Sequence, residues 1–485
     1  MHFFFSRLHV YFNTFYFLPL RWFFGILYFG LVLISFIIDP VQKYHAQRLL
    51  ELGLGIAILL WSSRASLDHI RENRPLVGWP YGFGLLGLFL VSLIGASLGS
   101  IPWVSLGFSG VLLLELALMP LVALAWHEHR ADALRVLALF SFCLIGTDLG
   151  FWVIARIHGW APYLAVWHFS PVTSLAFSPP YLFHNPRWAN QLTVLLLWSY
   201  LPLLHQLLSL QIRRYQFFWW SICLGVPSFC WIQIVLSNGD GAFISSLMAT
   251  LVAAFVWFRS VGYQRFLWGR ALSIALVALF FALLCSALLD STGLLADFVA
   301  RNAAEFNGVS PQSDRRLISW PLYLAASLRS PLWGTGIQVV PFGSSVCGPH
   351  NIWISLLYWT GFLGVFFSLF FFRSFSLSSS PFGLPMGVAL FFYQLVDDVW
   401  LRPVSLSVLL LLLSLFMPLE SDRIPHNALR YGWLHSFGMN LFRVRSLALC
   451  GLALILISVL QPGGVGLGPS PLVSRGSGSL CLLLF

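Results

Sequence analysis

The strongest constraint on this chain is a series of long apolar runs that carry almost no charge. A helix that crosses a bilayer needs about 20 mostly apolar residues. Runs that fit this requirement lie near residues 20–38, 48–62, 80–99, 103–126, 133–157, 191–211, 216–236, 241–258, 268–289, 351–372, 382–398, 403–418 and 446–461. The pattern predicts an all-α, polytopic integral membrane protein with about 12–13 transmembrane helices.

The composition agrees with this interpretation and excludes other classes. The 485 residues are 58% hydrophobic and only 9% charged, and the mean hydropathy is +0.83. A soluble domain carries about 25% charged residues. A soluble enzyme, a disordered chain and a nucleic-acid-binding protein are therefore excluded, and membrane lipids are the expected surroundings. The N-terminal stretch has no small-residue cleavage site, so we expect it to be retained rather than removed as a signal peptide.

The basic residues predict an orientation, because cytoplasmic loops of membrane proteins are enriched in arginine and lysine. Most of them follow even-numbered runs or precede the first: Arg7, Arg21, Arg64, Arg71, Arg74, Arg130, Arg135, Arg213, Arg214, Arg259, Arg265, Arg270, Arg373, Arg423, Arg430, Arg443 and Arg445. This places the N-terminus in the cytoplasm. It places two longer segments, about 158–190 and 290–350, on the outside.

We therefore divide the chain into four parts. Residues 1–289 hold transmembrane helices 1–9, with an outer loop at about 158–190, and residues 290–350 form a large periplasmic loop. Residues 351–461 hold the C-terminal helices, and residues 462–485 form a flexible tail. Within the large loop, Leu317, Trp320, Leu324 and Leu328 share one helical face. This spacing predicts an amphipathic helix from Arg315 to Ser330 that lies along the outer interface.

The segment after this helix contains the most specific pattern of the chain. Gly334 and Gly336 allow a tight turn, and Asn351 can cap the helix that begins the next apolar run. Gly361 and Gly364 lie one turn apart and would let a neighbour approach closely. His350 lies at the mouth of that helix, where it is either a catalytic base or an ordinary interfacial histidine.

Taken together, these residues resemble the large outer loop of the O-antigen ligase and Wzy-type polymerase family. The family pattern is an Arg-Leu then Trp start, a Pro-Leu-x-Gly-x-Gly turn, a His-Asn pair and a Gly-x-x-Gly helix. The matching positions are Arg316, Leu317, Trp320, Pro331, Leu332, Gly334, Gly336, His350, Asn351, Gly361 and Gly364. The many-span architecture with one long outer loop is also similar to that family.

The resemblance implies a glycosyltransferase of the bacterial inner membrane that inverts the anomeric configuration. The donor would be a glycan on a polyprenyl diphosphate, and the acceptor a sugar hydroxyl of lipid A core or of a growing glycan chain. Arginine forks pair well with phosphate, so Arg315, Arg316 and Arg329 are assigned to the donor. His350 is assigned as the general base and Asn351 as a substrate-binding neighbour. The loops show no Asp-x-Asp motif, and we expect no metal or other cofactor.

One position departs from the family pattern. The family has an arginine, thought to bind phosphate, at the outer end of a mid-chain helix, where this chain has Asp240. A carboxylate cannot hold an anionic diphosphate directly, so either another cation substitutes or the donor is handled differently. Arg187, in a polar stretch similar to the family's lead-in to a membrane helix, is the first candidate, and Arg402 is the second.

Two other functional classes stay open at this stage. A lipid-linked glycan flippase or transporter would need a central cationic cavity, whereas most arginines here lie in loops. A non-catalytic family member is the third hypothesis. Glu115 and Asp148 lie inside predicted spans, where ionisable residues are costly and are therefore candidates for function. Asp397 and Asp398 lie at the outer mouth between the eleventh and twelfth runs, where they could also form a local ion pair with Arg402.

Overall fold

The computed structural model describes residues 77–99, 102–126, 130–157, 186–209, 215–236, 240–289, 315–337, 351–376, 383–395 and 441–460. Within these ranges the chain is almost entirely α-helical, and the described residues contain no β-strand. The predicted runs near 20–38, 48–62 and 403–418 lie outside the described residues.

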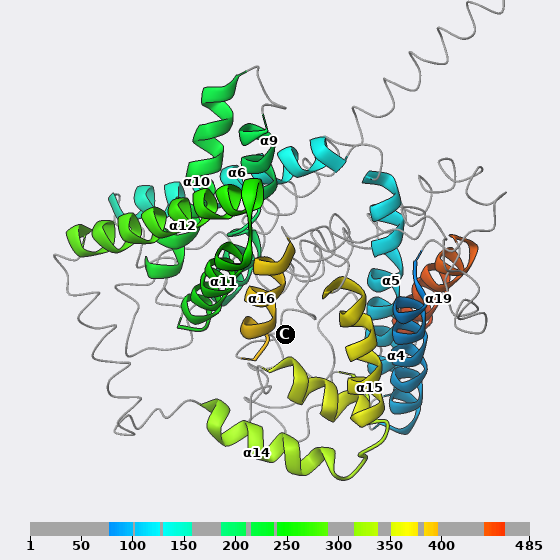
Figure 1. Ribbon diagram of the computed structural model, residues 1–485. Helices are drawn as coiled ribbons and strands as arrows, with labels where there is room; N and C mark the ends of the chain where they lie inside the picture. The colour runs from blue at the N-terminus through cyan, green and yellow to red at the C-terminus, as the bar shows by residue number, and fades with distance from the viewer. Residues whose placement is uncertain are drawn as a thin grey trace, which may run out of the picture.

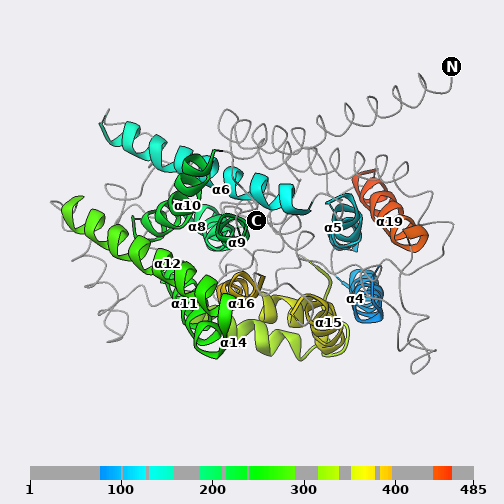
Figure 2. The same ribbon diagram turned by 45° about the horizontal axis from the view of Figure 1, so that its top comes forward.

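The helices form two groups that lie side by side in both views of the ribbon (Figures 1 and 2). The first group contains α4 (Trp79–Leu98), α5 (Pro102–Trp126), α15 (Ile352–Ser376) and α19 (Leu441–Leu460). In this group α5 packs against α19 and α4, and α4 packs against α15. The shorter helix α14 (Arg315–Ser327) packs on α15.

The second group is built around α10. It contains α6 (Arg130–Ile157), α8 (Pro186–Leu196), α9 (Leu201–Leu208), α10 (Gln216–Leu236), α11 (Asp240–Arg259), α12 (Gly262–Leu289) and α16 (Gly383–Tyr393). α10 packs against α12 and α6, while α16 packs against α11 and α8. The two groups meet where the end of α16 contacts the start of α15.

Seven of the described segments are long and apolar enough to cross a membrane. They are Trp79–Leu98, Pro102–Leu121, Asn190–Leu208, Gln216–Val235, Gly241–Arg259, Gly262–Cys285 and Ile352–Phe371. Many large apolar side chains on these helices point away from the protein, as Phe258 and Phe280 do with 74% and 68% of their surface exposed. An apolar exterior of this kind suits lipid contact, and the chain has the helices of a multi-pass membrane protein.

Each predicted run that falls within the described residues contains a helix, but four of these runs are not matched by one continuous spanning segment; one of the four, the run at 446–461, forms α19, which is not among the seven segments. The run near 382–398 gives only the 11-residue helix α16, which is too short to cross a bilayer alone. The run at 133–157 forms the long helix α6, which is not among the seven segments. The run at 191–211 is interrupted by a turn between α8 and α9.

The turn between α8 and α9 is stabilised by backbone hydrogen bonds within the turn. Ser199 N–H donates to the Leu196 carbonyl, and Leu201 N–H donates to the Trp198 carbonyl. Pro202 follows at once and has no N–H to satisfy, as expected at the start of a helix. The side chains of the turn are buried, and the Tyr200 hydroxyl donates to the Ala271 carbonyl of α12 at 2.8 Å.

Candidate site at the broken helix α15

The central feature of the site is a break in α15. Gly361 has φ 65° and ψ −169°, a combination that is not helical and that a side chain would strain. A break frees backbone groups on both of its sides, and each freed group needs a new partner away from water. The break is therefore stable only if another segment supplies those partners.

The segment Pro331–Gly336, hereafter the glycine turn, supplies them. Thr335 N–H donates to the Tyr358 carbonyl, and Gly336 N–H donates to the Trp359 carbonyl, each at 3.0 Å. In the opposite direction, Phe362 N–H donates to the Pro331 carbonyl at 2.8 Å and Leu363 N–H to the Leu332 carbonyl at 3.2 Å. The turn thus pairs with α15 on both sides of Gly361.

Glycine is required on both partners of this pairing. Gly334 has φ 70° and Gly336 has φ 96°, and a Cβ at Gly334 would overlap the backbone of Trp359 and Thr360. A Cβ at Gly361 would overlap the backbone of Leu332 and of Trp333. The Pro-Leu-x-Gly-x-Gly element and the first glycine of the Gly-x-x-Gly element therefore form the two sides of one backbone contact.

The two glycines of the Gly-x-x-Gly pair differ. Gly361 allows a close approach, whereas the atoms nearest to a Cβ at Gly364 would belong to the Thr360 side chain of the same helix, so the approach of a neighbour at Gly364 stays a prediction. Helix α4 also approaches α15 and the glycine turn closely. A Cβ at Gly84 would lie 2.7 Å from the Phe371 N atom of α15, and a Cβ at Gly95 would lie 2.7 Å from the Trp333 carbonyl oxygen of the turn and 3.2 Å from the Trp359 carbonyl oxygen of α15.

Two further residues hold the glycine turn, and the sequence analysis did not single them out. Ser105 of α5 donates through its hydroxyl to the Ile337 carbonyl at 2.8 Å. The Thr335 hydroxyl donates to the Tyr358 carbonyl at 3.1 Å, beside the bond from its own N–H. A threonine between two glycines is an indirect signal for such a side-chain contact, whereas Ser105 is separated from the turn by more than 200 residues and has no local signal.

Helix α14 aligns Arg315 and Arg316 with the start of α15. Figure 1 shows α14 beside the first half of α15, with both helices running from the α16 side of the molecule toward α4. Tyr323 of α14 stacks edge-on against Tyr358 of α15, with ring centroids 5.1 Å apart. Seven residues earlier, about 10 Å back along each axis, are Arg316 and Asn351, so their backbones lie at the same end of the helix pair.

The exposed face of α14 is the one expected to be apolar. Leu324 and Leu328 are 43% and 70% exposed, whereas Tyr323 and Ala326 are buried against the protein. A helix from Arg315 is thus confirmed, although it ends at Ser327 rather than at Ser330. Leu324 and Leu328 are thus exposed for contact with lipid, as an interfacial helix requires.

Asn351 fixes the start of α15 in two ways. Its Oδ1 accepts from Trp353 N–H at 3.0 Å and from Ile354 N–H at 3.2 Å, which confirms the predicted N-cap. Its Nδ2 donates to the Leu395 carbonyl at 2.9 Å, and Ile352 N–H donates to the Gln394 carbonyl at 3.0 Å. The start of α15 is therefore attached to the end of α16, and Asn351 is only 7% exposed.

The other arginines assigned from the sequence are not all at this junction. Arg329 is exposed at the opposite end of α14, about 20 Å along the helix from Arg316. Arg187 is in the first turn of α8, and α8 packs on α16. The side chains of Arg187, Arg315 and Arg316 lie outside the described part. His350, Arg402, Asp397 and Asp398 also lie outside the described residues.

The remaining polar candidates are the acidic residues Asp240, Glu115 and Asp148. Asp240 is the first residue of α11, and its side chain lies outside the described part. Glu115 and Asp148 are 5% and 3% exposed, so both lie inside the protein rather than toward lipid. Within the described residues, no three His, Cys, Asp or Glu side chains are grouped so that they could hold a metal ion.

Comparison with known proteins adds no family assignment. No protein-family model matches this chain, and no curated protein sequence matches it.

Proposed function

We propose that the chain is a membrane glycosyltransferase of the O-antigen ligase or polymerase type. It would transfer a glycan from a polyprenyl-diphosphate carrier to a sugar hydroxyl at the outer face of the bacterial inner membrane. The observation that carries the proposal is the pairing of the glycine turn with the break in α15. This contact joins motif elements that are about 30 residues apart in the chain, and it brings the arginine end of α14 level with Asn351.

The donor end of the proposed site is the start of α14. The leaving group is a diphosphate, which is already a good anion and needs charge stabilisation more than a proton. Guanidinium forks of Arg315 and Arg316 would bind it bidentately, and they would act strongly because water is scarce at a lipid-facing site. Arg187 and Arg402 remain the candidates to replace the cation that the family has where this chain has Asp240. Arg329 would contact a more distant part of the substrate.

The acceptor end is the junction of α15 and α16. His350 precedes Asn351 directly, and Asn351 is held by three hydrogen bonds. In the proposed step the acceptor oxygen forms a bond to the anomeric carbon while the bond from that carbon to the diphosphate oxygen breaks. The acceptor proton goes to His350, and the electron pair leaves with the polyprenyl diphosphate. Attack opposite the diphosphate would invert the anomeric centre.

A transporter is the main alternative, since broken helices are common at transporter binding sites. In such sites the freed backbone groups line a cavity and coordinate substrate or ions. Here the groups freed at Gly361 are paired with the glycine turn, and those between α8 and α9 are paired within their own turn. Arginines in the described helices also stay in the first or last third of each helix. These observations favour an enzyme over a flippase.

The test is a transfer assay with purified chain, a polyprenyl-diphosphate-linked glycan and a glycan acceptor. We expect wild type to form the new glycosidic bond, and Arg316→Ala and Arg316→Lys both to lose most of the transfer, because an ammonium cannot form the fork. Arg301→Ala, a change in the same loop but outside the motif, should be mild. Near-normal transfer by Arg316→Lys would contradict the fork, and carrier movement across vesicles without bond formation would support the transporter.

A further inference from the structure

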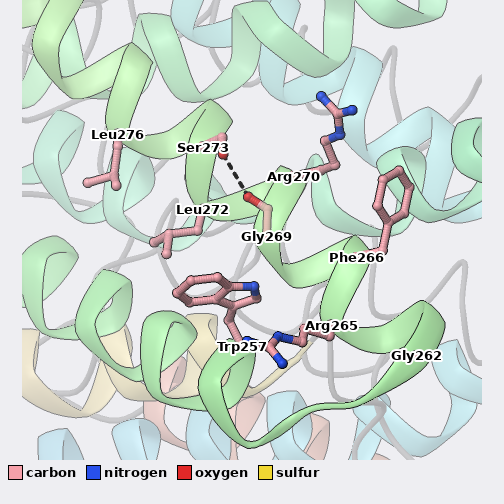
Figure 3. A pocket seen from close by; sticks show the side chains of 9 residues that line it. All are labelled: Trp257, Gly262, Arg265, Phe266, Gly269, Arg270, Leu272, Ser273 and Leu276. Atoms are coloured by element: carbon pink, nitrogen blue, oxygen red, sulfur yellow. Dashed lines mark hydrogen bonds between the residues drawn. The ribbon is translucent and has the colours of Figure 1, made fainter.

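The α11–α12 hairpin carries a pocket that the proposed reaction does not use. Its volume is about 600 Å³, and its lining includes Trp257, Arg265, Phe266, Gly269 and Arg270 (Figure 3). The arginines stack on aromatic rings: the guanidinium carbon of Arg265 lies 5.8 Å from the Trp257 ring centroid, and that of Arg270 lies 5.3 Å from the Phe266 ring centroid.

The pocket is rich in hydrogen-bond donors and has no negative charge in its lining. Arg265 and Arg270 are exposed, and neither makes an ion pair with a carboxylate among the described residues. The indole of Trp257 lies over Gly269, where a Cβ would be only 3.0 Å from Nε1. Guanidinium and indole N–H groups are donors only. Such a lining is suited to an anion.

The length of α12 places this pocket at the level of lipid headgroups. Its 28 residues span about 42 Å, whereas the hydrocarbon core is about 30 Å thick. Residues 271–289 contain no charged side chain and are long enough to cross the core by themselves. With residues 271–289 across the core, the first two and a half turns of α12, which include Arg265 and Arg270, extend beyond the hydrocarbon, next to Arg259 at the end of α11.

An apolar stripe continues from the pocket along α12. Leu276 lines the pocket, and Phe280 and Leu284 follow at four-residue steps on the same helix face. They are 48%, 68% and 44% exposed, respectively. The site thus combines a cationic end at headgroup height with an open apolar track that points into the membrane. A free phosphate would use only the first of these, whereas a phospholipid would use both.

We infer that this pocket binds an anionic phospholipid, with its phosphate at Arg265 or Arg270 and an acyl chain along the Leu276–Leu284 stripe. The positive-inside prediction puts this lipid in the cytoplasmic leaflet, the leaflet opposite the proposed transfer site. The inference does not depend on the glycan-transfer proposal, because it uses none of the residues assigned to that reaction.

The test uses the full-length purified chain in neutral detergent and follows its thermal unfolding during titration with defined probes. Dioctanoyl phosphatidylglycerol should raise the unfolding temperature with saturation, and dioctanoyl phosphatidylcholine and inorganic phosphate should not. The double variant Arg265→Ala/Arg270→Ala should weaken the apparent affinity for phosphatidylglycerol about tenfold or more. Arg373→Ala, which removes another exposed arginine on the same predicted side, should leave it unchanged.

A variant that keeps the charge distinguishes binding in the pocket from a general electrostatic attraction of the anionic lipid to the arginines. Gly269→Leu keeps every arginine but places a side chain against Trp257, so it should also weaken phosphatidylglycerol binding. Unchanged binding in Gly269→Leu, or in the double arginine variant, would overturn the pocket. An equal response to phosphatidylcholine would overturn the role of charge, and an equal response to inorganic phosphate would overturn the lipid.

Discussion

The two arginine-bearing regions of the molecule are built by different means. At the glycine turn, backbone pairs with backbone across the break at Gly361, and positions that need positive φ fix the geometry. At the α11–α12 hairpin the helices are continuous on each side of a short connection, and side chains form the site through cation–π contacts. At the first region, backbone contacts leave little choice of residue at the glycine positions. At the second, an added methyl group should change the stability little, whereas loss of the arginines or a bulky side chain against Trp257 should weaken binding.

The difference suggests separate roles. A backbone-to-backbone contact holds its flanking helices in one relative position, which a reaction with two substrates requires. An exposed cationic pocket with an apolar track requires no such precision, because a lipid adapts to the surface it meets. The same substitution should therefore lower the free energy of unfolding more at the glycine turn and its partner Gly361 than in the α11–α12 hairpin.

The largest difference should appear between two glycine-to-alanine changes. Gly361→Ala puts a side chain at φ 65° and into the Leu332 carbonyl, so it should lower the free energy of unfolding by about 3 kcal/mol or more. Gly269→Ala meets only the Trp257 side chain in a regular helix, and its effect should stay within about 1 kcal/mol. Denaturation in a series of dodecyl sulfate concentrations would measure both. Equal losses would contradict a backbone contact at Gly361.

The next effect concerns catalysis and not folding. His350→Ala should lower turnover by roughly 10²-fold, since proton transfer by a positioned side chain contributes about 10²–10⁴-fold. Membrane insertion and donor binding should survive, because the arginines hold the diphosphate. Transfer by the wild type should also fall in acid, where a protonated imidazole accepts no proton. A His350→Gln enzyme with near wild-type transfer and the same pH profile would remove His350 from the mechanism.

A smaller effect should separate the two bonding roles of Asn351. Asn351→Asp keeps an oxygen that accepts from Trp353 and Ile354, so α15 stays capped, but it loses the donor to the Leu395 carbonyl. Asn351→Ala loses both and should cost about 0.5–2 kcal/mol of stability. Comparing the unfolding and the transfer rate of the two variants would show whether the cap or the link to α16 matters more. An alanine variant as stable as wild type would contradict both roles.

The sequence predicted the helical class and most of the described spans, because a bilayer allows few alternatives to an apolar helix. It also marked Gly334, Gly336 and Gly361 as unusual. It could not show that these glycines meet, since the two segments are separated along the chain and no periodicity relates them. The turn between α8 and α9 was missed for another reason. Its residues Leu197 to Tyr200 are apolar or small, so in the sequence they look like part of a single span. The turn is held by buried hydrogen bonds from Ser199 to α6 and from Tyr200 to α12, which the sequence does not show.

The buried face of α14 shows the same limit. The leucine spacing predicted the helix, but Tyr323, which forms the contact with α15, lies outside the predicted apolar stripe. Its partner Tyr358 is one of several aromatic residues in a predicted span, and nothing local distinguishes it. Only the tertiary placement connects the arginine end of α14 with the start of α15.

The most direct test of the account is the side of the membrane on which each region lies. In a chain with its seven cysteines replaced, a single cysteine at Ser310 would report the loop that leads to α14, and one at Ser260 would report the α11–α12 connection. An impermeant maleimide should label Ser310→Cys in intact cells and Ser260→Cys only after the membrane is opened. The reverse pattern would invert the orientation and remove the outer-face transfer site, and labelling of both positions in intact cells would contradict the separation of the two regions.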